Sequence, residues 1–266
     1  MHGGARTQEG GKEVSAMLRI FDCNALIGAP MRPLPYVQPS LDDLLAQMAR
    51  QGIQRALVRH VACPEAGPET GNELLMRESS GRDQLLPAWS IAPGVHTRLG
   101  APQAVVRHML SAGACAAWMT PEAHGYVLEP WCCEHVLAAL DERAVPLLVH
   151  WSEVPGGSLG RVLGAFPALP VVLLDPRRQG RNRMLYPLLE RHENLHVAVM
   201  PTCAAYRGIE DLCAEFGAGR LLFGSGYPHY APGAALAMLT YAEISDAQRR
   251  AIAWGNLERL ISGVIR

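Results

Sequence analysis

Eight short apolar runs alternate with helix-like segments, and this regular alternation constrains the fold more than any other feature. The runs are LRIFDC, RALVRHV, LLPAWSI, ACAAWM, VPLLVHW, PVVLLD, LHVAVM and RLLFGS. Segments with helical periodicity lie between them, such as LDDLLAQMARQG, EPWCCEHVLAALDERA and RMLYPLLERHE. Continuous apolar strands, each followed by an amphipathic helix, are typical of a parallel sheet buried on both faces. The pattern predicts an α/β fold, a (β/α)8 TIM barrel. An open doubly wound sheet is the alternative, although no Gly-rich dinucleotide fingerprint follows any run.

The length of 266 residues suits one barrel domain, and no second-domain boundary is visible. We expect residues 1–17 to be a disordered leader and residues 18–266 to form the barrel. Ser245 begins the pattern SDAQ, which is a Ser-x-x-Gln capping box and marks the start of the last helix.

Charge and cysteine content narrow the partners and the compartment. The formal net charge is -1, which gives no electrostatic reason to expect nucleic acid or an anionic membrane as a partner. No apolar run approaches the roughly 20 residues that span a bilayer. Seven cysteines is an odd number, and none forms a CxxC pair. Buried free thiols in a cytoplasmic protein are therefore expected.

The barrel prediction locates the chemistry, because active sites of such barrels lie at the carboxyl ends of the strands. Polar residues gather at these ends, while the strand bodies are apolar. The positions at the ends are Asp22, Asn24, Arg59, His60, Ser90, Trp118, Met119, His150, Trp151, Asp175, Arg177, Arg178, Met200, Thr202, Cys203, Ser225, Tyr227 and His229.

Two C-terminal motifs carry a family resemblance. GRLLFGSGYPHYAP, followed by AIAWGNLERLI, resembles the signature of the amidohydrolase-2 branch of the amidohydrolase superfamily, which usually reads Phe-Gly-Ser-Asp-x-Pro and then Gly-Asn-x-x-Arg-Leu. Upstream, AVPLLVHWSE, FPALPVVLLDPRRQG and HENLHVAVMPTC resemble three further strands of that family. The resemblance covers Leu18 to Arg266 and implies a metal-dependent TIM-barrel hydrolase or decarboxylase.

The metal ligands that this resemblance implies are mostly absent. The paired histidines of the first strand fall on Asn24 and Leu26, and the strand-eight aspartate, a ligand and general base, falls on Gly226. His150 keeps the strand-five histidine, whereas Asp175 stands in place of the strand-six histidine. Catalytic zinc normally has three protein ligands and an open position. We therefore expect a divergent member of the family without the usual metal centre, and no cofactor.

Three interpretations remain open. In the first, the barrel is catalytically inactive and serves as a ligand-binding or structural protein. In the second, it is a hydrolase or decarboxylase that acts without the metal on a small carboxylate-bearing substrate. In the third, a relocated zinc site uses some of His60, His150, Asp175, Cys203 and His229. The second interpretation is preferred, and a homo-oligomer is compatible with all three.

The preferred interpretation assigns a role to each candidate residue. His150 is the general acid or base, and Asp175 orients its ring. Guanidinium groups suit bidentate anion binding, so Arg59, Arg177 and Arg178 hold the substrate carboxylate. The remaining substrate-binding candidates are Asn24, His60, Trp118, Trp151, Tyr227 and His229.

Overall fold

Parallel strands form the centre of the molecule in the computed structural model, which describes residues 18–31, 39–94, 100–176, 183–203 and 207–266. Within these residues, eight strands pair in chain order from β1 to β8. Their bounds are β1 Phe21–Ile27, β2 Arg55–His60, β3 Leu85–Ser90, β4 Ala116–Met119, β5 Leu147–His150, β6 Val171–Leu174, β7 Leu195–Val199 and β8 Leu221–Phe223. Each strand falls on one of the apolar runs of the sequence.

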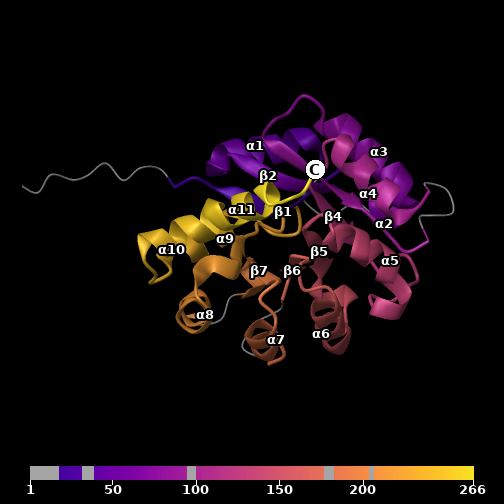
Figure 1. Cartoon of the computed structure of the whole chain (residues 1–266). Coiled ribbons are helices and arrows are strands. Elements are labelled where there is room, and N and C mark those ends of the chain that lie inside the picture. The colour runs from indigo at the N-terminus through magenta and orange to yellow at the C-terminus, as the bar shows by residue number, and fades with distance from the viewer. Residues whose placement is uncertain (1–17, 32–38, 95–99, 177–182, 204–206) are drawn as a thin grey trace, which may run out of the picture.

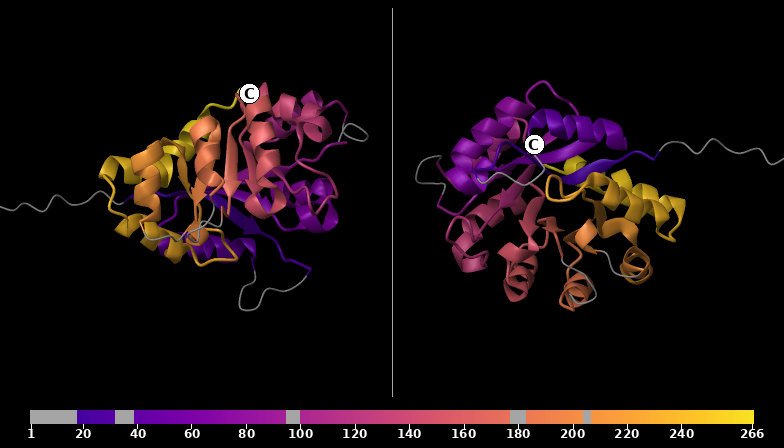
Figure 2. Two further views of the ribbon diagram at one scale, coloured as in Figure 1. Left: turned by 90° about the horizontal axis from the view of Figure 1, so that it is seen from below. Right: turned by 180° about the vertical axis from the view of Figure 1, so that it is seen from behind.

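Helices surround the strands on the outside (Figures 1 and 2). Their bounds are α1 Leu41–Gln51, α2 Ala62–Ala66, α3 Pro68–Ser79, α4 Pro102–Ser111, α5 Pro130–Asp141, α6 Gly156–Ala165, α7 Leu185–Arg191, α8 Gly208–Phe216, α9 Pro232–Tyr241, α10 Asp246–Arg250 and α11 Asn256–Ser262. The predicted TIM barrel is confirmed. Two connections carry more than the single helix expected: α2 and α3 both follow β2, and α9 to α11 follow β8.

The first and last strands meet, which distinguishes a barrel from an open sheet. The Leu26 N–H donates to the Tyr227 carbonyl at 3.0 Å, and the Gly226 N–H donates to the Asn24 carbonyl at 3.1 Å. The doubly wound alternative is therefore wrong. Strand β1 also runs to Ile27, beyond the predicted run, because its register against β2 shifts between Asp22 and Ala25. Such a bulge re-aims the side chains that follow it.

A buried carboxylate reinforces this junction. The Oδ1 atom of Asp22 accepts hydrogen bonds from the backbone N–H groups of Asn24 at 2.9 Å and of Ser225 at 2.8 Å. Asp22 is 1% exposed, and burial raises the pKa of its carboxyl group although these hydrogen bonds act in the opposite direction. One oxygen thus joins the loop after β8 to the first strand.

The C-terminal Gly-Asn-x-x-Arg-Leu motif has a structural role. The buried Asn256 amide donates to the carbonyls of Ala218 at 2.7 Å and Leu221 at 2.8 Å, at the start of β8. Arg259 donates to the Gly219 carbonyl at 2.7 Å. The capping box predicted at Ser245 is present before α10. This end of the chain therefore fixes where β8 begins.

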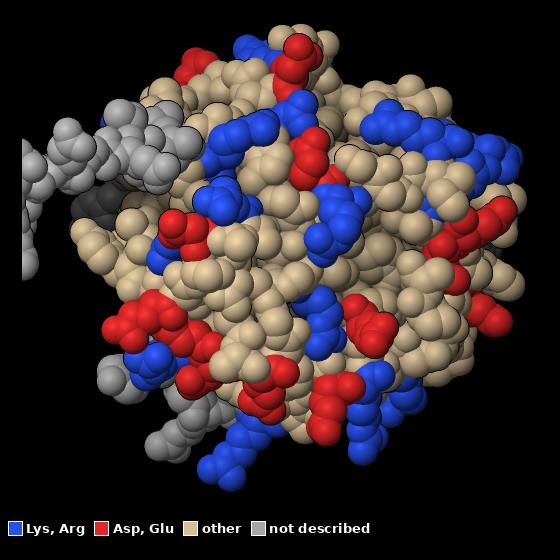
Figure 3. Space-filling model, turned by 60° about the vertical axis from the view of Figure 1, so that its left-hand side comes forward, with Lys and Arg blue, Asp and Glu red and all other residues tan. Residues whose placement is uncertain are grey.

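The cysteines are free thiols, as expected from the sequence. All seven cysteines are free, and all but Cys132 are buried. Acidic and basic side chains are interspersed on the face shown in Figure 3. None of the helices in the described ranges has the length and apolar character needed to traverse a bilayer. The predicted leader, residues 1–17, lies outside the described residues.

Replacing Asp22 by alanine should destabilise the fold. Two buried N–H groups would lose their acceptor, and an unsatisfied buried group costs about 1–3 kcal/mol. We expect Asp22→Ala to lower the free energy of unfolding by about 3 kcal/mol in urea denaturation. Asp22→Asn keeps an acceptor oxygen at the same position and should lose less than half as much. Equal stability of the alanine variant and the parent chain would refute this role.

Candidate functional site

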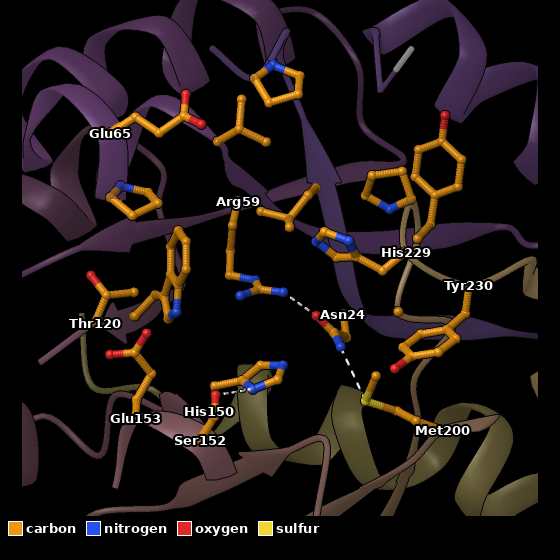
Figure 4. A pocket seen from close by; sticks show the side chains of 18 residues that line it. Asn24, Arg59, Glu65, Thr120, His150, Ser152, Glu153, Met200, His229 and Tyr230 are labelled. Atoms are coloured by element: carbon orange, nitrogen blue, oxygen red, sulfur yellow. Dashed lines mark hydrogen bonds between the residues drawn. The ribbon is translucent and has the colours of Figure 1, made fainter. Parts of the chain in front are cut away.

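A cavity of about 440 Å³ opens at the carboxyl ends of the strands (Figure 4). This volume lies in the range typical of small-molecule sites. Eighteen residues line it: Asn24, Leu26, Pro30, Arg59, Val61, Pro64, Glu65, Trp118, Thr120, His150, Ser152, Glu153, Met200, Gly226, Tyr227, Pro228, His229 and Tyr230. Six of them are residues that the sequence singled out for the site: Asn24, Arg59, Trp118, His150, Tyr227 and His229.

The guanidinium of Arg59 lies at the centre of the cavity (Figure 4). Its Nη2 donates to the side-chain oxygen of Asn24, and its Cζ stands 4.5 Å from the ring centroid of Trp118. Arg59 is 3% exposed, and its Nε has no hydrogen-bond partner among the described residues. Burial lowers the pKa of Arg59 to about 10, so the group stays charged at neutral pH. The cavity is thus built around a fixed positive charge.

His150 lies at the end of β5, on another wall of the same cavity (Figure 4). Its Nδ1 is 3.1 Å from the hydroxyl of Ser152, and its Nε2 is 3.9 Å from Oδ2 of Asp175. The second separation is an ion-pair distance and exceeds a hydrogen bond. Asp175 itself is not among the lining residues. The His150 side chain is 31% exposed, so its ring can contact a ligand, whereas the Asp175 side chain is buried.

The loop after β8 forms the wall that carries His229 and Tyr230 (Figure 4). The Tyr230 N–H donates to the Gly226 carbonyl at 3.2 Å, which turns the chain back over the cavity. His229 is exposed at the rim. Partial burial of the ring is the main cause that lowers the pKa of His229, and the positive charge of Arg59 lowers it further. This histidine is therefore largely neutral at neutral pH.

Gly226 is enclosed by two side chains of the cavity. It adopts a left-handed conformation with φ of +70°. A Cβ atom there would lie 2.7 Å from both Met200 Cε and Tyr230 Cδ2. The Met200 sulfur accepts hydrogen bonds from the Asn24 amide at 3.1 Å and from the Asp175 N–H at 3.2 Å. Any side chain at position 226 would displace this packing.

Two predicted site residues lie elsewhere. His60 is buried with its Nε2 3.5 Å from Glu78 Oε1, and a Cβ on Gly28 would lie 2.5 Å from its ring. Burial lowers the pKa of His60. Trp151 packs against the hydrophobic core and does not line the cavity. Successive side chains of a strand point to opposite faces, so His60 turns outward where Arg59 turns inward. Arg177 and Arg178 lie outside the described residues.

Five polar residues of the cavity were not predicted from the sequence. They are Glu65, Thr120, Ser152, Glu153 and Tyr230. Each follows a strand end by a few residues, within a loop, a short helix or a 3-10 turn. Their closeness in sequence to a strand end was the one signal that could have identified them. That closeness does not indicate which loop side chains turn toward the cavity.

A closed parallel barrel with a cavity at its carboxyl-terminal mouth places the protein in the class of TIM barrels. The model of the amidohydrolase family matches residues 28–262, and the chain belongs to this family. Among proteins with curated descriptions, none matches the chain in sequence.

Solved structures share the fold at low sequence identity. An uncharacterised TIM-barrel protein of Bordetella bronchiseptica has a TM-score of 0.73 at 18% identity, covering 94% of this chain and 100% of its own. A provisionally named 2-pyrone-4,6-dicarboxylic acid hydrolase of Pseudomonas putida has 0.71 at 20%, covering 93% and 99%. A dihydroxybenzoic acid decarboxylase of Polaromonas, with bound manganese and 2-nitroresorcinol, has 0.69 at 15%, covering 92% and 97%.

The donor atoms at the mouth do not fit the family's usual metal centre. Leu26 and Gly226 offer no side-chain donor, and the Asn24 oxygen already accepts from the cationic Arg59. A guanidinium at this position repels a divalent cation. Within the described ranges, no three His, Cys, Asp or Glu side chains come together as a metal-binding group. No three of His60, His150, Asp175, Cys203 and His229 form such a group in the described ranges.

Replacing Gly226 by alanine should destabilise the chain through the contacts with Met200 and Tyr230. We expect Gly226→Ala to cost about 3 kcal/mol in urea denaturation, from the left-handed backbone and from overpacking together. Gly52→Ala is the matched control, because Gly52 has φ of +67° and nothing within 4 Å of a Cβ. Gly52→Ala should lower the free energy of unfolding only through the left-handed backbone conformation, by about 1 kcal/mol.

In a Met200→Ala background, Gly226→Ala should cost less than it does in the parent chain, because one of the two contacts is already removed. If Gly226→Ala and Gly52→Ala cost the same, the cavity packing around position 226 is not the constraint inferred here.

Proposed function

We propose that the protein is a hydrolase or decarboxylase of small carboxylate-bearing compounds that works without the family's usual metal. The observation that carries this proposal is the Arg59 guanidinium, buried and charged at the centre of a small-molecule cavity. A carboxylate bound beside this guanidinium would accept charge-assisted hydrogen bonds from it. Charge-assisted hydrogen bonds of this kind are among the strongest in proteins.

His150 is the proposed acid–base group. Its ring faces the same cavity as Arg59, and Asp175 at 3.9 Å stabilises the imidazolium form when the ring takes up a proton. In hydrolysis the ring would accept a proton from the attacking water. In decarboxylation it would deliver a proton to the carbon that loses carbon dioxide. Both reactions need the substrate carboxylate held in place, which is the role given to Arg59.

The family and its fold support this proposal. The structural neighbours include proteins named for hydrolysis of a pyrone dicarboxylate and decarboxylation of a dihydroxybenzoate. These compounds are carboxylates small enough for a cavity of about 440 Å³. We further propose a cytoplasmic location, which suits a chain with seven free cysteines.

Removal of the Arg59 charge tests the binding role. Protein purified without chelator would be titrated with dihydroxybenzoates and pyrone carboxylates by calorimetry. Arg59→Gln should weaken the binding of a carboxylate ligand by about 10- to 100-fold, the value of a charge-assisted hydrogen bond. Arg250→Gln, at an exposed position of α10, should leave the affinity unchanged. Equal affinities of the Arg59→Gln variant and the parent chain would remove Arg59 from the site.

Turnover and metal content complete this test. His150→Gln should lower kcat on any compound that is turned over by about 100-fold or more. Metal analysis should find far less than one zinc or manganese per chain, and activity should survive chelation. Stoichiometric metal that activity requires would overturn the metal-free part of the proposal. Binding without turnover would favour a ligand-binding barrel.

A further inference from the structure

Two carboxylates line the cavity on the side opposite His229 and Tyr230, with Arg59 between the two sides (Figure 4). Glu65 comes from α2, and Glu153 comes from the 3-10 turn Trp151–Glu153 after β5. The cavity therefore has a cationic centre and one acidic wall. We call Glu65 and Glu153 the acidic wall.

Each carboxylate of the acidic wall is held in place by the backbone. The Oε2 atom of Glu153 accepts from the Glu122 N–H at 2.7 Å, and the Oε2 atom of Glu65 accepts from the Met31 N–H at 3.0 Å. The Ala123 backbone also forms a hydrogen bond with the Glu153 carboxylate. The carboxylates are thus oriented by the backbone before any ligand arrives, which reduces the cost of binding.

The acidic wall has no cationic partner of its own. Among the residues that the structure describes, no Arg or His nitrogen forms an ion pair with Glu65 or Glu153. Burial in the wall raises the pKa of Glu153, and the hydrogen bond from the Glu122 N–H acts in the opposite direction. Glu65 is exposed, so this desolvation concerns Glu153 alone. A partly desolvated carboxylate is electrostatically unfavourable, and a cationic ligand group would relieve it.

The centre of the cavity independently indicates a ligand. Arg59 and Trp118, 3% and 5% exposed, both line it. Neither Arg59 Nε nor Trp118 Nε1 has a hydrogen-bond partner in the described part of the chain. Buried donors in native proteins nearly always have partners. Both residues line the cavity, so a ligand there meets a charged guanidinium and an indole ring at its centre.

We propose that the substrate is a small zwitterion, whose carboxylate binds at Arg59 and whose protonated amine binds at the acidic wall. This proposal rests on the function proposed above, since it specifies the far end of the same ligand. A ligand with a second carboxylate at that end meets Glu65 and Glu153 as like charges and binds weakly. A neutral apolar end leaves both carboxylates without a countercharge.

A series of para-substituted benzoates tests the far end of the ligand alone. The compounds are 4-methylbenzoate, 4-(hydroxymethyl)benzoate, 4-(aminomethyl)benzoate and terephthalate, titrated by calorimetry at neutral pH with the meta isomers in parallel. We expect the aminomethyl compound to bind at least tenfold more tightly than the methyl compound. Terephthalate should bind most weakly of the series.

Glu153→Gln assigns the preference to the acidic wall. The glutamine keeps an oxygen for the Glu122 N–H but loses the charge, so the aminomethyl compound should bind about tenfold more weakly, with little change for the methyl compound. Glu65→Gln should act in the same direction, and the exposed Glu134→Gln on α5 should have no effect. Glu65→Gln alone decides the question if Glu153→Gln fails to fold.

The outcomes separate this inference from the function it rests on. Equal binding of the methyl and aminomethyl compounds, with both weakened by Arg59→Gln, overturns the zwitterion and leaves the carboxylate site standing. Tightest binding of the hydroxymethyl compound also overturns it, in favour of a neutral donor. If no compound in the series binds, both the zwitterion and the proposed function are contradicted.

Discussion

The barrel depends on one oxygen atom at the place where its first and last strands meet. Oδ1 of Asp22 accepts hydrogen bonds from the backbone N–H groups of Asn24 and Ser225. The strand ladder cannot easily provide acceptors for these two N–H groups, because β1 bulges there and β8 has ended. Two main-chain hydrogen bonds then cross the same junction, from Leu26 to Tyr227 and from Gly226 to Asn24. Because Asn24 and the β8 loop carry much of the cavity wall, the same carboxylate that closes the barrel also positions the site.

A fixed positive charge lies at the mouth within this closed frame. Arg59 hydrogen-bonds to Asn24 and stacks on Trp118. Met200 and Tyr230 fill the space beside Gly226. These features depend on one another: a side chain at position 226 would displace Met200, whose sulfur accepts from Asn24, the partner of Arg59.

The sequence predicts the fold better than the site, and particular residues show why. Apolar runs identify all the strands, because a strand buried on both faces needs continuous apolar residues. The extension of β1 to Ile27 was not predicted, since a bulge leaves no periodic signal. Strand-end logic found Arg59 and His150 but also His60, which strand alternation turns outward. Glu65 and Glu153 were missed because they lie on helical turns after the strands, where chain direction decides which side chains face the cavity.

Positive and negative groups at the mouth follow one electrostatic arrangement. A divalent ion at the mouth would neutralise nearby carboxylates. The Arg59 guanidinium neutralises less, because it carries a single charge and already donates a hydrogen bond to Asn24. Carboxylates at Glu65 and Glu153 then remain available for a group that the ligand brings. The arrangement separates positive and negative charge across one small cavity. Separated charges favour a ligand whose own charges match them in sign and position. Such recognition can be achieved by the side chains of the cavity alone.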